Sequence, residues 1–184
     1  PVYSTWDDHD FGRNDTHGKL RGKENSREAI MEYRANPSWG ENGEGIYTRF
    51  QWWPYDVWLI DTRWFAHTEP SFADPGEPTL IGRQQWEWLK AGLLESAAPH
   101  KLLVSGMIWN EATRPNKPDH WGAYPYEREA LFAFLAENDI EGVTLVGGDI
   151  HRSRIVRHVR ANAYDLTEVI SSPLHDSIIE AANA

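Results

Sequence analysis

Hydrophobic residues along the chain follow two spacings, one of about two residues and one of three to four. Short runs that alternate, or that are continuously apolar and rich in β-branched side chains, predict strands. The strands predicted in this way cover residues 2–6, 45–53, 55–63, 101–107, 142–148, 153–159 and 163–172. The runs at 45–53 and 55–63 are separated by little more than Pro54, so we expect an antiparallel pair.

Three other segments have helical spacing. The first covers residues 27–36, with Ser26 as the expected N-cap and Pro37 as its stop. The second and third cover residues 82–96 and 126–139. The apolar face expected for the second helix consists of Trp86, Leu89, Leu93 and Leu94.

Stretches rich in glycine, proline and polar residues predict surface loops at 12–25, 64–80 and 109–123. The alternation of strand, helix, strand, helix and strand predicts an α/β fold with mixed edge strands. Ligands of such sheets bind beyond the carboxyl ends of the strands. We therefore expect the chemistry of this chain where its predicted strands end.

An acidic stretch follows the first predicted strand directly. It reads WDDHDFGRND and places Asp7, Asp8, His9 and Asp10 side by side. Like charges this close repel, and burying them is costly unless a cation or a hydrogen-bond donor compensates. The stretch is therefore either a solvated loop or part of a site that holds cations.

A second group, Asp149 and His151, follows the strand predicted at 142–148. The D-x-H spacing can direct both side chains toward one ion, and Gly147 and Gly148 permit a close backbone approach to a ligand. Carboxylate oxygens suit hard cations, and imidazole adds affinity for iron, zinc or manganese. A strand-ending turn with a structural histidine is the alternative. Because both groups end predicted strands that can be neighbours, together they favour a metal site.

The composition narrows the choice of partners. A net charge of −10 disfavours non-specific binding to nucleic acid or to anionic membranes. It also works against anionic substrates, unless metal ions or local arginines reverse the sign at the site. No apolar run reaches the length of about 18 residues that predicts a membrane span. The chain has no cysteine, which excludes disulfides and thiolate metal ligands.

Five motifs, in order along the chain, resemble those of the alkaline phosphatase D (PhoD-like) metallophosphoesterase family. WDDHD at 6–10 resembles the family's W-D-D-H-[DE] block and is the most specific of the five. VGGDIH at 146–151 resembles its S-G-D-x-H block. The matches between them are DVWLIDTR at 56–63, IGRQQWEWLKAGLLES at 81–96 and WGAYPYERE at 121–129.

The resemblance implies part of a four-layered metallophosphoesterase-like β-sandwich, two packed sheets flanked by helices. It implies hydrolysis of phosphate monoesters, diesters or both, with two or more metal ions. Iron and calcium are the metals it implies first, with zinc or manganese as alternatives. Residues 1–184 would form a partial catalytic domain, and the protein would be secreted or periplasmic like many members.

The resemblance also implies roles for single residues. Asp8, Asp149 and His151 would be metal ligands, and Asp7 would bind metal or cap the turn. His9 would hydrogen-bond the phosphoryl oxygen or protonate the leaving group.

Three neighbours in the same stretch have expected roles as well. Asp10 would orient His9. Arg13, beside Asn14, would contact a phosphate oxygen, with a salt bridge inside its own acidic loop as the alternative.

Further along the chain, Asp61 and Arg63 are expected to pair and lock a strand end, with a substrate role as the alternative. For Trp109, Trp121 and Tyr124, a pocket wall and a structural position both remain open.

Two family blocks that precede W-D-D-H-[DE] have no counterpart here, among them one with a bridging aspartate. Two hypotheses follow: a fragment of a longer phosphoesterase, or a non-catalytic truncated fragment with at most a partial metal site. Half of a sandwich exposes sheet edges and apolar faces, so we expect the missing N-terminal half of the same enzyme, or another segment, as a partner. A glycoside hydrolase with paired carboxylates is a more distant alternative, and it would be active without metal.

Overall fold

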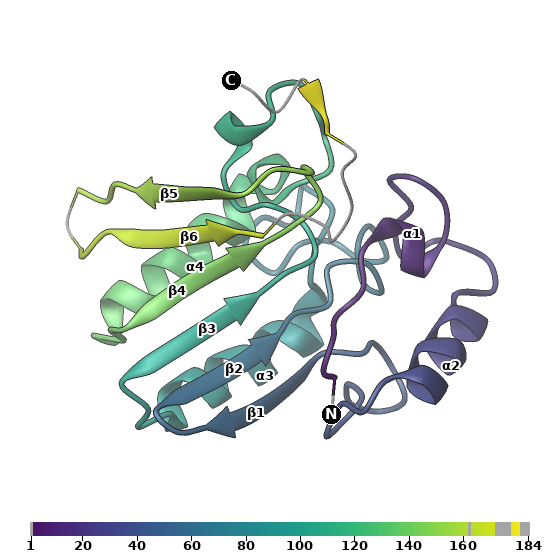
Figure 1. The fold of residues 1–184 in the computed structure, drawn as a ribbon, viewed down its shortest axis with the longest axis horizontal. Helices are drawn as coiled ribbons and strands as arrows, with labels where there is room; N and C mark the ends of the chain where they lie inside the picture. The colour runs from purple at the N-terminus through teal and green to yellow at the C-terminus, as the bar shows by residue number, and fades with distance from the viewer. Residues whose placement is uncertain (1, 162, 172–177, 181–184) are drawn as a thin grey trace.

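The computed structural model describes residues 2–161, 163–171 and 178–180. One sheet with the strand order β1-β2-β3-β4-β6-β5 forms the centre of the fold (Figure 1). Strands β2, β3, β4 and β6 run parallel, whereas β1 and β5 are antiparallel to their neighbours at the two edges. The predicted α/β fold with mixed edge strands is therefore confirmed. The strands are β1 (Thr48–Trp52), β2 (Tyr55–Leu59), β3 (His100–Val104), β4 (Val143–Gly147), β5 (Arg154–His158) and β6 (Leu166–Ile170).

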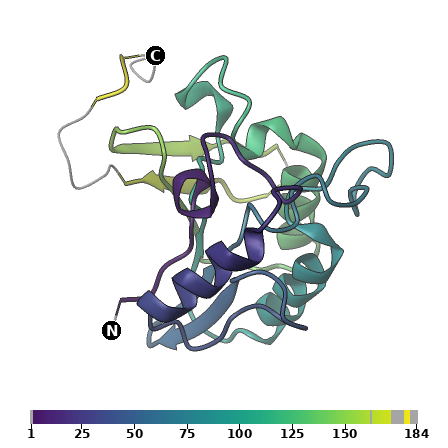
Figure 2. The same ribbon diagram turned by 90° about the vertical axis from the view of Figure 1, so that its right-hand side faces the viewer.

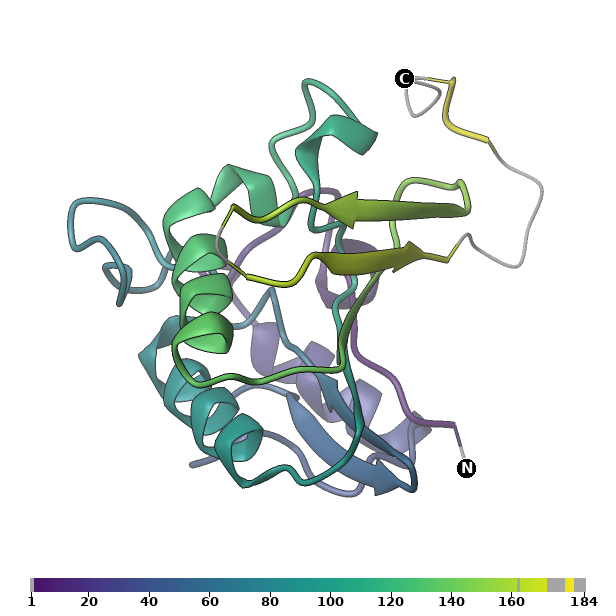
Figure 3. The same ribbon diagram turned by 90° about the vertical axis from the view of Figure 1, so that its left-hand side faces the viewer.

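Helices α3 (Gly82–Glu95) and α4 (Pro125–Glu137) cover one face of the sheet (Figure 3). Each connects two parallel strands, and such a connection has to cross over a face of the sheet. Trp58, Leu103 and Leu145 lie side by side on β2, β3 and β4 and form the buried core with both helices. Within α3, Leu94 is 59% exposed, so its predicted place on the buried face is wrong.

The opposite face of the sheet carries an apolar row. Val104, Val146, Val169 and Ile155 follow one another in register from β3 to β5. Their exposure rises toward the β5 edge, where Ile155 is 80% exposed. The described residues form one sheet, so the second sheet of the four-layered sandwich stays a prediction, and this row is the surface on which it would pack.

Helices α1 (Asp8–Phe11) and α2 (Lys23–Tyr33) lie beyond the carboxyl ends of β2 and β3 (Figure 1). Figure 2 looks toward this edge and shows both helices in front of the sheet. Helix α2 begins at Lys23, before the predicted N-cap Ser26, with Gly22 as its N-cap. The Ser26 hydroxyl instead donates to the carbonyl oxygen of Phe11 at 2.7 Å. Ser26 thus joins α2 to α1, a long-range contact that local capping rules do not anticipate.

The strand predicted at residues 2–6 is wrong. This segment is extended but pairs with no strand in the described structure. The Asn36 side chain instead satisfies the backbone hydrogen-bonding groups of Ser4. Ser4 N–H donates to Asn36 Oδ1 at 2.9 Å, and Asn36 Nδ2 donates to Ser4 O at 2.7 Å. The Thr5 hydroxyl adds a bond to Ile60 O at 2.8 Å. An amide side chain thus takes the place of a neighbouring strand.

Two of the predicted surface loops contribute to the core. Trp64 and Phe65 of the loop at 64–80 are buried. The loop at 109–123 contains the 3-10 helices η1 (Glu111–Thr113) and η2 (Trp121–Ala123). Trp109 and Trp121 are fully buried and stacked, with ring centroids 4.2 Å apart, which favours the structural alternative for both. None of the described helices is long and apolar enough to cross a membrane.

Candidate metal centre

Three carboxylates from distant parts of the chain converge beyond the carboxyl ends of the central strands. Asp7 and Asp8 lie at the start of α1, and Asp149 follows β4. One ligand oxygen of each lies within 4.8 Å of the others. The two acidic groups seen in the sequence therefore meet in space, as a shared metal site requires.

A tryptophan anchor positions the acidic segment. Trp6 is fully buried, and its indole Nε1 donates to Asp61 Oδ1 at 2.7 Å. Its ring packs edge-on against Phe11, with centroids 4.8 Å apart. Gly106 permits the approach, because a Cβ at this position would lie 2.6 Å from the carbonyl oxygen of Trp6. The Trp6 contacts with Asp61 and Phe11, and the close approach of Gly106 just after β3, thus fix the segment that carries Asp7 and Asp8.

Asp61 organises the turn that follows β2. Its buried carboxylate accepts hydrogen bonds from the backbone N–H groups of Ile46, Arg63 and Trp64, each at 2.9 Å, in addition to the Trp6 indole. Such a carboxylate replaces the missing hydrogen-bond partners of a sharp turn. Asp61 therefore acts as the hub that joins the β2 turn to the acidic segment.

Asp61 and Arg63 pair, as expected, but through the backbone N–H of Arg63, which donates to Asp61 Oδ1, and not through the guanidinium. The Arg63 guanidinium turns instead to the candidate site, where it binds Asp119 through two bonds of 2.8 and 2.7 Å. Its Nε donates to Asp7 Oδ1 at 3.0 Å, and its Nη2 contacts the same oxygen. Burial raises the pKa of Asp7 to about 6, although this guanidinium favours the charged form. Arg63 therefore compensates the charge of two carboxylates at once.

Asp8 is the most buried member of the cluster, with 3% of its surface exposed. Burial opposes its ionisation, but the backbone N–H groups of Asp15 and His9 donate to it at 2.9 and 2.8 Å and hold its pKa below the usual value. Asp8 also belongs to a second group, in which its ligand atoms and those of Asp15 and Asp119 lie within 4.8 Å. One carboxylate is thus common to both groups, the position that a bridging ligand occupies in a two-metal site.

Basic side chains from the loop between β3 and α4 complete the cluster. The Lys117 ammonium lies 2.6 Å from Asp149 Oδ2, 3.6 Å from Asp15 Oδ1 and 3.8 Å from Asp119 Oδ2. Arg114 Nη1 lies 3.5 Å from Asp149 Oδ2. Sequence reasoning did not select Asp15, Asp119 or these cations. Asp15 could have been found, because it lies in the acidic stretch WDDHDFGRND. Arg114, Lys117 and Asp119 lie in a loop whose sequence contains no recognisable metal-binding motif.

Replacing Lys117 by methionine is expected to tighten Ca²⁺ binding at least about tenfold. The ammonium repels a second cation at about 4 Å, a separation at which charges interact by up to about 4 kcal/mol near a protein surface. Calorimetric titration with CaCl₂ measures the change. Lys90→Met removes a surface lysine paired with Glu87 and should leave the affinity unchanged. Equal or weaker binding by Lys117→Met would contradict the placement of the ion among these carboxylates.

A cavity of about 560 Å³ adjoins the cluster. His9, Asn14, Asp149 and His151, which the sequence analysis singled out, all contribute to its wall. Neither histidine belongs to the two carboxylate groups found among the described residues. Asp149 and His151 have φ values of 69° and 51°, a left-handed conformation that is costly for residues other than glycine. The D-x-H turn is therefore a locally strained backbone beside the cluster.

Other predicted site residues lie away from this cavity. The Asp10 carboxylate accepts the backbone N–H of Asp7 at 3.1 Å in a capping box at the start of α1. Asp10 also lines a different cavity, together with Ser26 of α2. Among the described residues its carboxylate therefore bonds the start of α1 and not His9. Arg13 is exposed, and no ion pair of its guanidinium occurs within the part of the chain that the structure describes. A Cβ at Gly148 would lie 2.8 Å from the carbonyl oxygen of Gly106, so this glycine permits a close approach between two backbone segments.

Comparison with known proteins places these features in a family. Residues 1–184 match the family model described as PhoD-like phosphatase. Alkaline phosphatase D of Bacillus subtilis (strain 168) is 27% identical over 183 residues, which covers 83% of this chain and 31% of the relative. The solved "Structure of PhoD" superposes with a TM-score of 0.71 at 22% identity, covering 91% of this chain and 38% of that one, and shows a shared fold. The chain therefore spans about a third of the length of these proteins, and it belongs to the PhoD-like phosphatase family.

Proposed function

We propose that this chain carries part of a metal-dependent phosphoesterase site, which hydrolyses phosphate monoesters, diesters or both. The observation that carries the proposal is the meeting of Asp7, Asp8 and Asp149, with Asp8 shared by the group of Asp15 and Asp119. Membership of the PhoD-like phosphatase family supports the same reaction class. A relative named alkaline phosphatase D supports it as well.

The donor set favours hard cations. Asp7, Asp8 and Asp149 offer only carboxylate oxygen, which suits calcium, magnesium or manganese. Iron or zinc would gain a nitrogen ligand from His151 or His9, which line the adjoining cavity. A cation bound there would polarise the phosphoryl oxygens and lower the pKa of a bound water.

Side chains of the protein would supply the rest of the chemistry. Arg114 and Lys117 line the cavity and bring positive charge to a chain that is acidic overall. They can hold an anionic ester while His9, in the same wall, hydrogen-bonds a phosphoryl oxygen or protonates the leaving group. Asn14 contributes an amide donor to the same wall.

We also propose that a further segment of the enzyme completes the site and the sheet. The chain covers 31% and 38% of the two relatives, and the apolar row Val104, Val146, Val169 and Ile155 leaves a surface to be covered. A secreted or periplasmic location is part of the same proposal and rests on the family resemblance alone.

Metal content and activity, measured on one preparation, test the proposal. The purified chain is dialysed extensively and its metals are measured by elemental mass spectrometry. Hydrolysis of p-nitrophenyl phosphate and bis(p-nitrophenyl) phosphate is then followed before and after chelation with EDTA. We expect near-stoichiometric metal, and we expect any turnover by this part of the site to be lost on chelation and restored by Ca²⁺ or Mn²⁺.

The other outcomes are equally informative. Bound metal without turnover would support the non-catalytic alternative for this chain, with a partial metal site that the rest of the enzyme completes. Turnover that survives chelation would contradict metal dependence. Neither metal nor turnover would contradict the proposal for this chain as a whole.

A further inference from the structure

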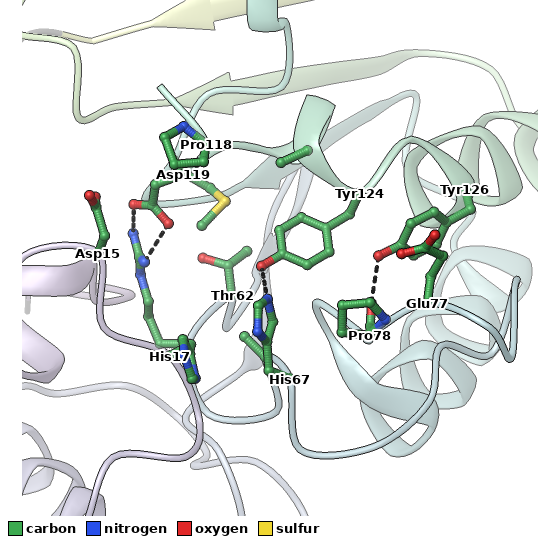
Figure 4. Close-up of a pocket in the computed structure, with 14 residues that line it drawn as sticks. Asp15, His17, Thr62, His67, Glu77, Pro78, Pro118, Asp119, Tyr124 and Tyr126 are labelled. Atoms are coloured by element: carbon green, nitrogen blue, oxygen red, sulfur yellow. Dashed lines mark hydrogen bonds and ion pairs between the residues drawn. The ribbon is translucent and has the colours of Figure 1, made fainter. Parts of the chain in front are cut away.

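A second cavity, of about 300 Å³, lies beside the carboxylate cluster (Figure 4). Asp15 and Asp119, members of the second carboxylate group, belong to its wall. Figure 4 shows Asp119 at one end of the cavity and Glu77 and Tyr126 at the other, with Thr62 between them. An ester whose phosphoryl group lies at the carboxylates would therefore extend its organic part along this cavity, toward Glu77.

The carboxylates in the wall differ in how far their charge is compensated. Asp119 accepts two bonds from the Arg63 guanidinium, at 2.8 and 2.7 Å, and the Lys117 ammonium lies 3.6 Å from Asp15 Oδ1. The Glu77 carboxylate is exposed, and it has no ion pair or hydrogen bond with any residue that the structure describes. The far end of the cavity therefore carries a negative charge that an occupant can reach.

Hydrogen bonds fix the segment that carries Glu77, although its side chain is exposed. The Glu77 backbone N–H donates to Asp74 O at 3.0 Å, and its carbonyl oxygen accepts the N–H of Ser71 at 2.8 Å. The Tyr126 hydroxyl donates to Pro78 O at 2.6 Å and joins the same segment to α4. The place of Glu77 in the wall is therefore set by the fold.

Aromatic rings line the cavity together with Glu77. The Tyr124 and Tyr126 rings meet at 75°, with centroids 6.3 Å apart, and the His67 ring lies edge-on to Tyr124 at 5.8 Å. Burial lowers the pKa of His67, so its imidazole is neutral at neutral pH and does not repel a cation. The faces of aromatic rings attract ammonium groups. Rings beside an unpaired carboxylate therefore favour a cation at this end.

The rest of the wall limits the occupant further. Ala66, Met107 and Ala123 supply apolar surface that suits a carbon chain. A second negative group would be repelled by Glu77, and a neutral group would leave its charge unused. The wall thus suits a carbon chain that ends in a positive charge.

We propose that this cavity binds the organic part of the phosphate ester, that this part ends in an ammonium group, and that the Glu77 carboxylate and the Tyr124 and Tyr126 rings bind the ammonium. These side chains then determine specificity and take no part in the chemical step. The inference rests on the proposed phosphoesterase function, since it names the class of ester that the same site accepts, the phosphate esters of amino alcohols.

Binding of matched phosphate esters to the intact chain, measured by calorimetry with excess Mn²⁺, tests the inference. Aminopropyl phosphate and aminohexyl phosphate carry a terminal ammonium on chains of different length. Butyl phosphate and heptyl phosphate carry a methyl group in its place, and inorganic phosphate reports on the phosphoryl position alone. At the chain length that spans the cavity, the ammonium ester is expected to bind about threefold to thirtyfold more tightly than its methyl partner, the combined value of a partly exposed ion pair and a cation–π contact.

Variants of the chain assign this preference to the named side chains. Glu77→Gln should lower the preference for the ammonium ester about twofold to fivefold and leave the affinity for inorganic phosphate unchanged. Tyr126→Leu removes one ring and should lower the preference as well, whereas Tyr126→Phe keeps the ring and should retain it. Thermal unfolding of each variant verifies that it is folded.

Asp74→Asn is the matched control. It removes a charge from the same loop at a position outside the lining of this cavity, and it keeps the oxygen that accepts the Gly76 N–H. It should bind every ligand like the unsubstituted chain.

The outcomes distinguish the inference from the function on which it rests. If inorganic phosphate binds but ammonium and methyl esters bind equally at both lengths, the ammonium subsite is wrong and the phosphoesterase proposal stands. The same holds if Glu77→Gln leaves the preference unchanged, or lowers it no more than Asp74→Asn does. If none of the phosphate compounds binds, both are wrong.

Discussion

Replacing Asp8 by asparagine is expected to abolish metal binding and to lower kcat/KM for p-nitrophenyl phosphate by at least about a hundredfold. Asp8 is the carboxylate common to both acidic groups, so its loss weakens two ion positions together. Changing residues that merely support a metal ligand costs about 10- to 100-fold, and a shared ligand should cost more. Elemental analysis of the dialysed variant gives a readout that does not depend on activity.

Two controls separate loss of metal from local unfolding. Asp8 accepts the backbone N–H groups of Asp15 and His9, so an amide at this position also disturbs the loop. Asp149→Asn removes a carboxylate whose described ion pairs are with Lys117 and Arg114, and it should lose metal as well. Asp139→Asn, on the exposed turn after α4, should behave like the unsubstituted chain. Undiminished metal in the Asp8 variant would contradict the proposed centre.

Replacing Asp61 by alanine is expected to lower the free energy of unfolding by about 3–5 kcal/mol. The substitution leaves four buried donors without their acceptor: the indole of Trp6 and the backbone N–H groups of Ile46, Arg63 and Trp64. Each unsatisfied buried donor costs about 1–3 kcal/mol, and partial relaxation reduces the sum. Because the ten tryptophans report on unfolding, urea titration followed by fluorescence measures the change.

The same variant tests how the fold positions the site. Without Asp61 the Trp6 anchor loses its hydrogen bond, so metal affinity should fall even though Asp61 is in neither carboxylate group. Asp74→Ala is the matched control, since Asp74 accepts one backbone N–H, from Gly76, on an exposed loop. It should cost less than about 1 kcal/mol. An Asp61 variant as stable as the control would refute its role as the hub of the turn.

Local patterns in the sequence were sufficient for most of the sheet and its helices. The strands β1 to β6 and helices α3 and α4 were all predicted, because apolar spacing reflects which face of an element is buried. The same reasoning failed at residues 2–6, which have strand-like spacing but hydrogen-bond to the side chain of Asn36. It also failed for Ser26, whose hydroxyl bonds a residue of another helix. Both failures come from partners distant in the sequence.

The sequence by itself determined the fold class, the family and the two acidic groups, because these depend on residue types at short spacing. Only the tertiary structure decided which residues surround Asp8. Arg63, Lys117 and Asp119 come from loops that follow different strands and meet only when the sheet has formed. It also turned Asp10 toward the start of α1 and left Thr62 unpaired beside a cavity. The physical reason is that charge compensation and hydrogen-bond satisfaction are set by distances in the folded chain, and periodicity along the sequence carries no information about those distances.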